Sequence, residues 1–105
     1  MRACVIGANG QDGSILTQKL LEKSIQTDCL TRENINLNDR KQVKEIFSYI
    51  KPTHVFYLAA AHGSSTEMNK IPKSKILSVN YEGLKNVVSC LDSLNLRPWI
   101  FYPLS

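Results

Sequence analysis

Short segments with strand character alternate with amphipathic segments along most of the chain. Four segments are predicted to be strands and cover residues 2–6, 26–31, 54–58 and 99–105, and all except the second are mainly apolar. Continuous apolar runs are typical of strands in a parallel sheet, where helices cover both faces. In the last run Pro103 cannot donate a hydrogen bond to a neighbouring strand, so we expect it at the end of that strand.

Three amphipathic segments between the runs are predicted to be helices. The first extends from Gly10 to about Lys23. The second begins at a cap formed by Asn38 or Asp39 and ends before Pro52, because proline disfavours helical geometry in the residue before it. The third covers residues 76–94. Their apolar positions recur at helical spacing: Ile15, Leu16, Leu20 and Leu21, then Val43, Ile46, Phe47 and Ile50, then Ile76, Leu77, Leu84, Val87, Val88, Leu91 and Leu94.

Strands that alternate with helices imply right-handed crossovers and a parallel sheet. The predicted class is therefore a Rossmann-type α/β fold with flanking helices. A short extended piece at residues 34–37 adds an outer strand, and the simplest strand order is 3-2-1-4-5. At 105 residues the chain is short for a doubly wound fold, so we expect residues 1–105 to form one incomplete domain, a truncated half-fold with an exposed edge strand.

Composition narrows the classes of partner. The net charge of +4 comes from scattered lysines and arginines rather than a basic stripe, which argues against nucleic acid. No apolar stretch could span a bilayer and the first residues do not resemble a signal peptide, so we expect a cytoplasmic protein with no membrane partner. The cysteines form no C-x-x-C pair, and Cys4, Cys29 and Cys90 are expected to be reduced, buried and structural. His54 has no metal ligand at suitable spacing, so no metal site is predicted.

A glycine-rich turn, G-A-N-G-Q-D-G at residues 7–13, joins the first strand to the first helix. The start of a helix carries unpaired N–H groups and a partial positive charge, which together favour a pyrophosphate. Gly7 would allow the tight turn, Gly10 would leave room for the phosphates, and Gly13 would let the helix pack against the strands. A purely structural connection would also account for three glycines. The turn has no G-K-[S/T], which excludes a P-loop.

The end of the second strand carries the residues that would distinguish one dinucleotide from another. The guanidinium of Arg32 could pair bidentately with a 2′-phosphate and stack on adenine, which favours NADP. Glu33 could instead bind a ribose 2′-hydroxyl, as in NAD enzymes. A third interpretation makes Arg32 a solvated loop residue.

Four segments resemble the extended short-chain dehydrogenase/reductase family, which includes the NAD-dependent nucleotide-sugar epimerases and dehydratases. Residues 7–16 resemble its cofactor loop, and the Gly-Gln-Asp-Gly-Ser core is similar to that of GDP-mannose 4,6-dehydratases. Residues 51–61 resemble its K-P-D-x-V-x-x-L-A-A segment and residues 79–86 its V-N-x-x-G-T-x-N helix. Residues 101–105 resemble the strand that leads into the catalytic serine or threonine. Between the second strand and residue 51 the chain is shorter than a GDP-mannose dehydratase and looks more like a dTDP-4-dehydrorhamnose reductase.

The resemblance implies a set of cofactor contacts. Residues 58–61 would form a wall of small side chains beside the ribose and phosphates, with a packed strand end as the alternative. Asn36 and Leu37 stand where the family commonly has an aspartate and an apolar residue beside the adenine, and an amide can still hydrogen-bond the adenine amino group. Asn80 would lie near the catalytic end of the cofactor, or else be a buried, internally satisfied amide. The predicted cofactor-binding residues are Gly7, Asn9, Gly10, Gln11, Asp12, Gly13, Arg32, Asn36, Leu37, Leu58, Ala59, Ala60, Ala61 and Asn80.

The family's catalytic Y-x-x-x-K pair has no counterpart at the expected place. Tyr81 and Lys85 match the spacing, but they precede the last predicted strand, whereas the family's pair comes from a later helix. We therefore treat the match as chance and assign no catalytic residue. His62 is interpreted as a solvated loop residue, and the catalytic hydroxyl would lie just beyond Ser105. The substrate domain is expected to be absent from this chain.

These observations predict the NADP-binding part of a nucleotide-sugar dehydratase or epimerase similar to GDP-mannose 4,6-dehydratase, not catalytic by itself, with NAD as the alternative cofactor. Within the family, a dTDP-4-dehydrorhamnose reductase is the second hypothesis. Outside it, the alternative is a noncatalytic nucleotide-binding module or a truncated gene product. The expected partners are the dinucleotide, a nucleotide sugar in the intact enzyme, and a second copy of the chain in a homo-oligomer.

Overall fold

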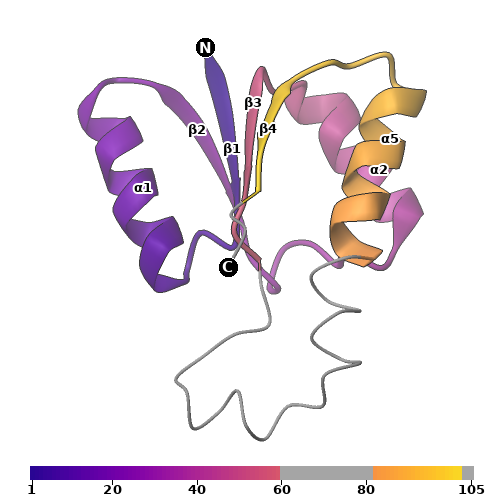
Figure 1. Ribbon diagram of the computed structural model, residues 1–105, viewed down its shortest axis with the longest axis horizontal. Coiled ribbons are helices and arrows are strands. Elements are labelled where there is room, and N and C mark those ends of the chain that lie inside the picture. Colours follow the sequence, from indigo (N-terminus) through magenta and orange to yellow (C-terminus); the bar gives the residue numbers. More distant parts are fainter. Residues whose placement is uncertain (60–81, 103–105) are drawn as a thin grey trace, which may run out of the picture.

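A sheet of four parallel strands forms the centre of the protein, with α1 on one face and α2 and α5 on the other (Figure 1). The computed structural model describes residues 1–59 and 82–102. The elements are β1 (Arg2–Ile6), α1 (Gln11–Glu22), β2 (Gln26–Leu30), α2 (Arg40–Ile50), β3 (His54–Tyr57), α5 (Gly83–Ser93) and β4 (Trp99–Phe101). The predicted Rossmann-type α/β class is confirmed.

Strand β1 lies inside the sheet, whose order is β2-β1-β3-β4. Ile6 pairs with Leu30 of β2 and with Tyr57 of β3, so these strands finish together. Every pairing is parallel, which places all of the strand carboxyl ends at one edge. In the predicted order 3-2-1-4-5, strand 3 was the segment at residues 34–37, so strands 4 and 5 correspond to β3 and β4. The last four positions of that order are therefore confirmed.

The predicted outer strand at residues 34–37 is wrong, because this segment forms turns. The Leu30 carbonyl accepts the N–H of Gly7 at 2.8 Å, so the Cys29 carbonyl and the Thr31 N–H point the other way, to the open edge of β2. The Asn34 side chain binds both of them. Its Nδ2 donates to the Cys29 oxygen at 3.2 Å and its Oδ1 accepts from the Thr31 N–H at 2.8 Å. A local amide thus occupies the groups that a further strand would need.

Side chains alternate between two apolar clusters, one on each face of the sheet. On β1, Cys4 and Ile6 face α2 and α5, whereas Ala3 and Val5 face α1. Helix α2 contributes the fully buried Val43 to the larger cluster. Burial of a side chain of this size stabilises a fold by about 1.5–3 kcal/mol. The two clusters therefore hold the helices against both faces of the sheet. The buried members of the larger cluster are Cys4, Ile6, Leu30, Ile35, Val43, Phe47, Ile50, Val55, Tyr57, Val87, Cys90 and Leu91.

The cysteines are all free thiols, but they do not share one environment. Cys4 and Cys90 are buried as predicted, whereas Cys29 is exposed, so the prediction of a buried Cys29 is wrong. The error comes from treating β2 as a central strand. It is an edge strand of the described sheet, and the Cys29 thiol points to the α1 side, where it donates to the Thr17 hydroxyl at 3.9 Å.

Helix α2 begins and ends where the sequence predicted. The Asp39 carboxylate caps it by accepting the N–H of Gln42 at 3.2 Å. Lys51 adopts a left-handed conformation, with φ of 49°, and ends the helix before Pro52. Helix α5 confirms the later part of the third predicted helix, and the part that begins at Ile76 lies outside the described residues. Within residues 1–59 and 82–102, none of the helices combines the length and apolar character needed to cross a membrane.

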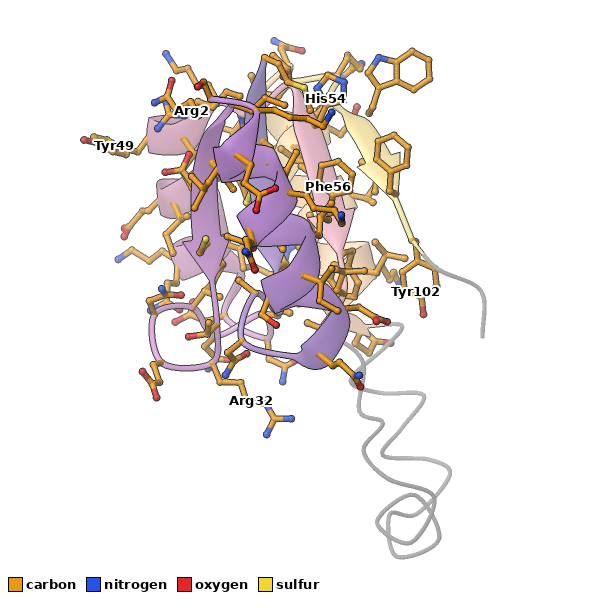
Figure 2. All side chains as sticks on the ribbon, turned by 90° about the vertical axis from the view of Figure 1, so that its left-hand side faces the viewer. Arg2, Arg32, Tyr49, His54, Phe56 and Tyr102 are labelled. Atoms are coloured by element: carbon orange, nitrogen blue, oxygen red, sulfur yellow. The ribbon has the colours of Figure 1, made fainter. Side chains whose placement is uncertain are left out.

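Strand β4 lies at the other edge of the sheet and leaves aromatic side chains in solvent. Trp99 is 70% exposed and Phe101 is 47% exposed. The Phe101 ring stacks on that of Phe56, with 4.8 Å between centroids, on the same face of the sheet as α1. Figure 2 shows Phe56 with His54 on this part of the sheet, where α1 does not cover them fully. The described part of the chain therefore has the open, apolar edge that a half-fold predicts.

Candidate functional site

The candidate site lies at the edge of the sheet where the parallel strands end. Helix α1 begins at the same edge as the loops that follow β1, β2 and β3 (Figure 1). In open α/β sheets this is the edge at which ligands bind, because helix N-termini and adaptable loops gather there. The topology therefore brings the glycine turn, the end of β2 and the end of β3 together.

Gly7 is the point at which the glycine turn approaches β3. Its φ is +88°, which favours glycine, and its N–H donates to the Leu30 carbonyl at 2.8 Å. A Cβ at this position would lie 2.7 Å from the carbonyl carbon of Leu58 and 2.8 Å from the nitrogen of Ala59. Gly7 is thus required by both the backbone conformation and the close approach of the two strand ends.

Gly10 differs from its neighbours in the turn. A Cβ on Gly13 would overlap the Gly7 carbonyl oxygen, so Gly13 is required for packing α1 against the turn. A Cβ on Gly10 would meet only that same oxygen, at an ordinary contact distance of 3.5 Å. Its φ of −76° and ψ of 172° suit any residue. Among the described residues, nothing sterically requires a glycine at position 10, and the space beside it is open to a ligand.

Helix α1 begins without a side-chain cap. The Ser14 N–H bonds to the Gly10 carbonyl at 2.9 Å, so the helical hydrogen bonds start there and the earlier N–H groups of the first turn have no intrahelical acceptor. The side chains of Asn9, Gln11 and Asp12 are exposed around this end. Asp12 suits the positive end of the helix dipole, although its carboxylate would repel a phosphate placed directly beside it. Binding of an anion here would rely on backbone N–H groups.

The carboxyl end of β3 lies directly beside the glycine turn. The Leu58 N–H donates to the Ile6 carbonyl at 2.8 Å, which continues the sheet one residue past β3. Leu58 packs with the cluster on the α1 face and Ala59 with the cluster on the opposite face. Both are half-buried, so part of each remains accessible at the edge. Ala60, Ala61 and Asn80 were also predicted to bind cofactor and lie outside the described residues, as do His62 and Tyr81.

The turn after β2 places Arg32 at the rim of the site. The side chain is exposed, and Figure 2 shows it extending away from the body of the protein at the edge where α1 begins. Among residues 1–59 and 82–102, no ion pair engages its guanidinium. The neighbouring Glu33 is exposed too. The structure thus presents one cation and one anion in the turn that follows β2.

Asn36 and Leu37 lie between the β2 turn and α5. The Asn36 side-chain oxygen accepts the N–H of Asn38 at 3.1 Å, and a carbonyl oxygen has a second lone pair for another donor. Leu37 is half-buried against the larger apolar cluster. Its carbonyl accepts the Nδ2 of Asn86 at 2.9 Å, which ties α5 to this loop. Asn86 belongs to the segment at residues 79–86 that resembles the family's V-N-x-x-G-T-x-N helix, but the sequence did not predict its hydrogen bond to Leu37.

Two buried acids belong to β1 and β3, the strands that end at the site. The pKa of the Cys4 thiol is raised to about 12, mainly by burial and to a smaller extent by the nearby Asp28 and Cys29. Burial likewise raises the pKa of Tyr57 to about 12, with a smaller contribution from Tyr102. Both groups are therefore neutral near pH 7. In the described part of the chain, no histidine, cysteine, aspartate or glutamate cluster could hold a metal ion.

Comparison with known proteins gives a family match over almost the whole chain. The model of the family described as "NAD dependent epimerase/dehydratase family" matches residues 3–103. A monomeric L-threonine 3-dehydrogenase from a metagenome shares 27% identity at a TM-score of 0.75, covering 98% of this chain and 36% of that one.

Two further solved structures share the fold at lower identity. The UDP-glucose 4-epimerase of Thermus thermophilus, solved with NAD, has 24% identity and a TM-score of 0.74, covering 92% of this chain and 35% of its own. The dTDP-4-dehydrorhamnose reductase of Bacillus anthracis, solved with NADP, has 20% identity and a TM-score of 0.75, covering 92% and 34%. The chain therefore spans about a third of the length of the solved proteins it matches.

Proposed function

The chain belongs to the NAD-dependent epimerase/dehydratase family, and from this premise we propose that residues 1–105 form the nicotinamide-dinucleotide-binding domain of such an enzyme. The domain would be incomplete by itself, with substrate binding and catalysis requiring parts that correspond to the remaining length of its relatives. A dinucleotide would lie along the carboxyl edge of the sheet.

The observation that carries the proposal is the open space beside Gly10. Gly7 and Gly13 have packing reasons to be glycine, whereas Gly10 has none within the described protein. A pyrophosphate at the start of α1 would supply that reason, because a side chain at position 10 would occupy its place. The uncapped N–H groups of the first turn would bind the phosphate oxygens.

The remaining contacts follow from the positions of the loops. Arg32 would bind the 2′-phosphate of NADP with its charged N–H groups, and the preference for NADP over NAD rests on this residue. Asn36 and Leu37 would lie beside the adenine, and the residues that follow the carboxyl end of β3 would lie beside the ribose. The proposed set is Gly7, Asn9, Gly10, Gln11, Asp12, Gly13, Arg32, Asn36, Leu37, Leu58, Ala59, Ala60, Ala61 and Asn80.

The proposed parent activity is that of a nucleotide-sugar dehydratase or epimerase similar to GDP-mannose 4,6-dehydratase. The Gly-Gln-Asp-Gly-Ser core of the turn supports this choice. The likeness to dTDP-4-dehydrorhamnose reductases supports a reductase as the second candidate. When bound, the cofactor supplies hydride-transfer chemistry. The residues of this chain hold and orient it: the glycine turn anchors the pyrophosphate and Arg32 selects the nucleotide.

A titration of the 105-residue chain tests the proposal. Isothermal titration calorimetry with NADPH, NADH and ADP should give saturable binding of both dinucleotides, with NADPH the tighter, and weaker binding of ADP. An absence of binding by both dinucleotides would overturn the proposed function. Tighter binding of NADH than NADPH would retain the dinucleotide site and overturn the role of Arg32.

A further inference from the structure

At the carboxyl end of β2, one side chain close to Arg32 binds the open edge of the strand. Asn34 donates from Nδ2 to the Cys29 carbonyl at 3.2 Å and accepts the Thr31 N–H on Oδ1 at 2.8 Å. Both backbone groups point away from β1, to the open edge at the end of β2. The amide therefore matches the donor and acceptor of a strand edge, and it does so at the carboxyl end of β2, where the candidate site begins.

The same residue closes the turn that carries Arg32. The N–H groups of Asn34 and Ile35 both donate to the Thr31 carbonyl, at 3.1 and 3.0 Å. The Thr31 hydroxyl accepts the Glu33 N–H at 3.2 Å. Ile35 is buried in the larger cluster, which anchors the far end of the turn. Arg32 stands at the tip, so the backbone from which its side chain extends is held by its neighbours on both sides.

The side-chain bonds of Asn34 join this turn to the end of β2. Without them, the turn would keep its internal bonds to Thr31 but would lose its attachment to the Cys29 carbonyl and the Thr31 N–H. Asn34 is itself exposed, so its truncation removes no apolar packing from the core. The consequence would fall on the placement of the turn, and therefore on the long side chain of Arg32.

We infer that Asn34 is a positioning residue for Arg32 and determines how strongly the site prefers a 2′-phosphorylated dinucleotide, although Asn34 does not touch the cofactor. The inference rests on the proposed function. An arginine recognises a phosphate by a planar fork of N–H groups, so a displaced or mobile backbone weakens the paired geometry. NADH lacks the 2′-phosphate, and its affinity does not depend on that geometry.

The test measures the dissociation constants of NADPH and NADH for the 105-residue chain and its variants by calorimetry. Arg32→Ala should weaken the binding of NADPH about tenfold, because charge-assisted hydrogen bonds are lost, and should change the binding of NADH by less than about twofold. Asn34→Ala should weaken NADPH about fivefold with the same small effect on NADH. Asn34→Ser should recover part of the loss, because a hydroxyl can accept the Thr31 N–H. Asn38→Ala is the matched control, since Asn38 is also exposed and bonds through its backbone N–H.

The double variant Arg32→Ala/Asn34→Ala separates positioning from general destabilisation. If Asn34 acts through Arg32, its substitution should have no further effect on NADPH once Arg32 is gone. Equal losses for NADPH and NADH in Asn34→Ala, unchanged NADPH binding, or the same NADPH loss in the Arg32→Ala background would each overturn the inference while leaving the dinucleotide site intact. Failure of the unsubstituted chain to bind either dinucleotide would overturn the proposed function, and the inference with it.

Discussion

Gly13 lies directly against the carbonyl group of Gly7, with no room for a side chain between them. A Cβ at residue 13 would overlap the Gly7 oxygen and lie 2.9 Å from the Cα of Ala8. The contact holds the first turn of α1 on the loop after β1, so the position of the helix N-terminus depends on it. The glycine turn is thus a packing joint as well as a candidate ligand site.

Gly13→Ala should destabilise the protein by about 1–3 kcal/mol, because the added methyl group meets backbone that cannot move away cheaply. Urea unfolding followed by circular dichroism measures the change. Gly10→Ala is the matched control: its Cβ meets only an ordinary contact, and the helix cap changes by less than about 1 kcal/mol. Equal stabilities for the two variants would contradict the packing role of Gly13.

Gly10→Val should separate binding from folding. The introduced isopropyl group would project into the space that the proposed pyrophosphate occupies, while the backbone conformation at this position suits any residue. We expect the variant to fold with a free energy of unfolding within about 1–2 kcal/mol of the parent, and to bind NADPH and NADH at least about a hundredfold more weakly. Calorimetry checks the affinity and circular dichroism the fold. Unchanged affinity in a folded variant would show that the cofactor lies elsewhere.

The glycine turn was predictable from sequence because all of its parts lie close together along the chain. A strand, a glycine at the strand end and a helix start follow one another within residues 2–13, and the structure brings them together as expected. The sequence also predicted a packing role for Gly13 and an open space beside Gly10. It could not name the atoms that exclude a side chain at Gly13, because those distances are defined only by the folded backbone.

The outer edge of the sheet was less predictable. Residues 34–37 alternate polar and apolar side chains as a short strand does, but one side-chain amide, that of Asn34, binds the edge groups at the end of β2 instead. The same edge explains the incorrect expectation for Cys29, since periodicity alone does not show which strand is outermost. The exposure of Cys29 depends on the order of the strands in the sheet, which short sequence windows do not contain.

The exposure of Cys29 predicts selective thiol chemistry. In the folded chain, Ellman's reagent should modify Cys29 at least about a hundredfold faster than Cys4 and Cys90, because buried thiols react only through opening of the structure. All three cysteines should react together in guanidinium chloride. Cys29→Ser should remove the fast phase without slowing the others. A fast phase that accounts for two or more thiols per chain would show that Cys4 or Cys90 is more accessible than the structure indicates.

Alkaline pH should destabilise the fold through two buried acids. The pKa of Cys4 rises from 9.0 to about 12 and that of Tyr57 from 10.0 to about 12 on folding, both mainly because burial disfavours the charged form. A raised pKa in the folded state means that the unfolded chain loses its protons first. The stabilisation is therefore complete below pH 9 and is lost as the pH rises from about 9 to about 12.

The free energy of unfolding should fall by at least about 2 kcal/mol across that range, since one unit of pKa difference corresponds to about 1.4 kcal/mol. Urea titrations under reducing conditions at intervals of pH measure the slope. Tyr57→Phe keeps the aromatic ring that packs against Tyr102, at 5.6 Å between centroids, but removes the ionisable hydroxyl. Whatever its stability at neutral pH, the variant should decline less steeply above pH 10, because one of the two ionising groups is gone. An identical decline in the parent and in Tyr57→Phe would show that Tyr57 ionises as readily in the folded chain as in the unfolded one.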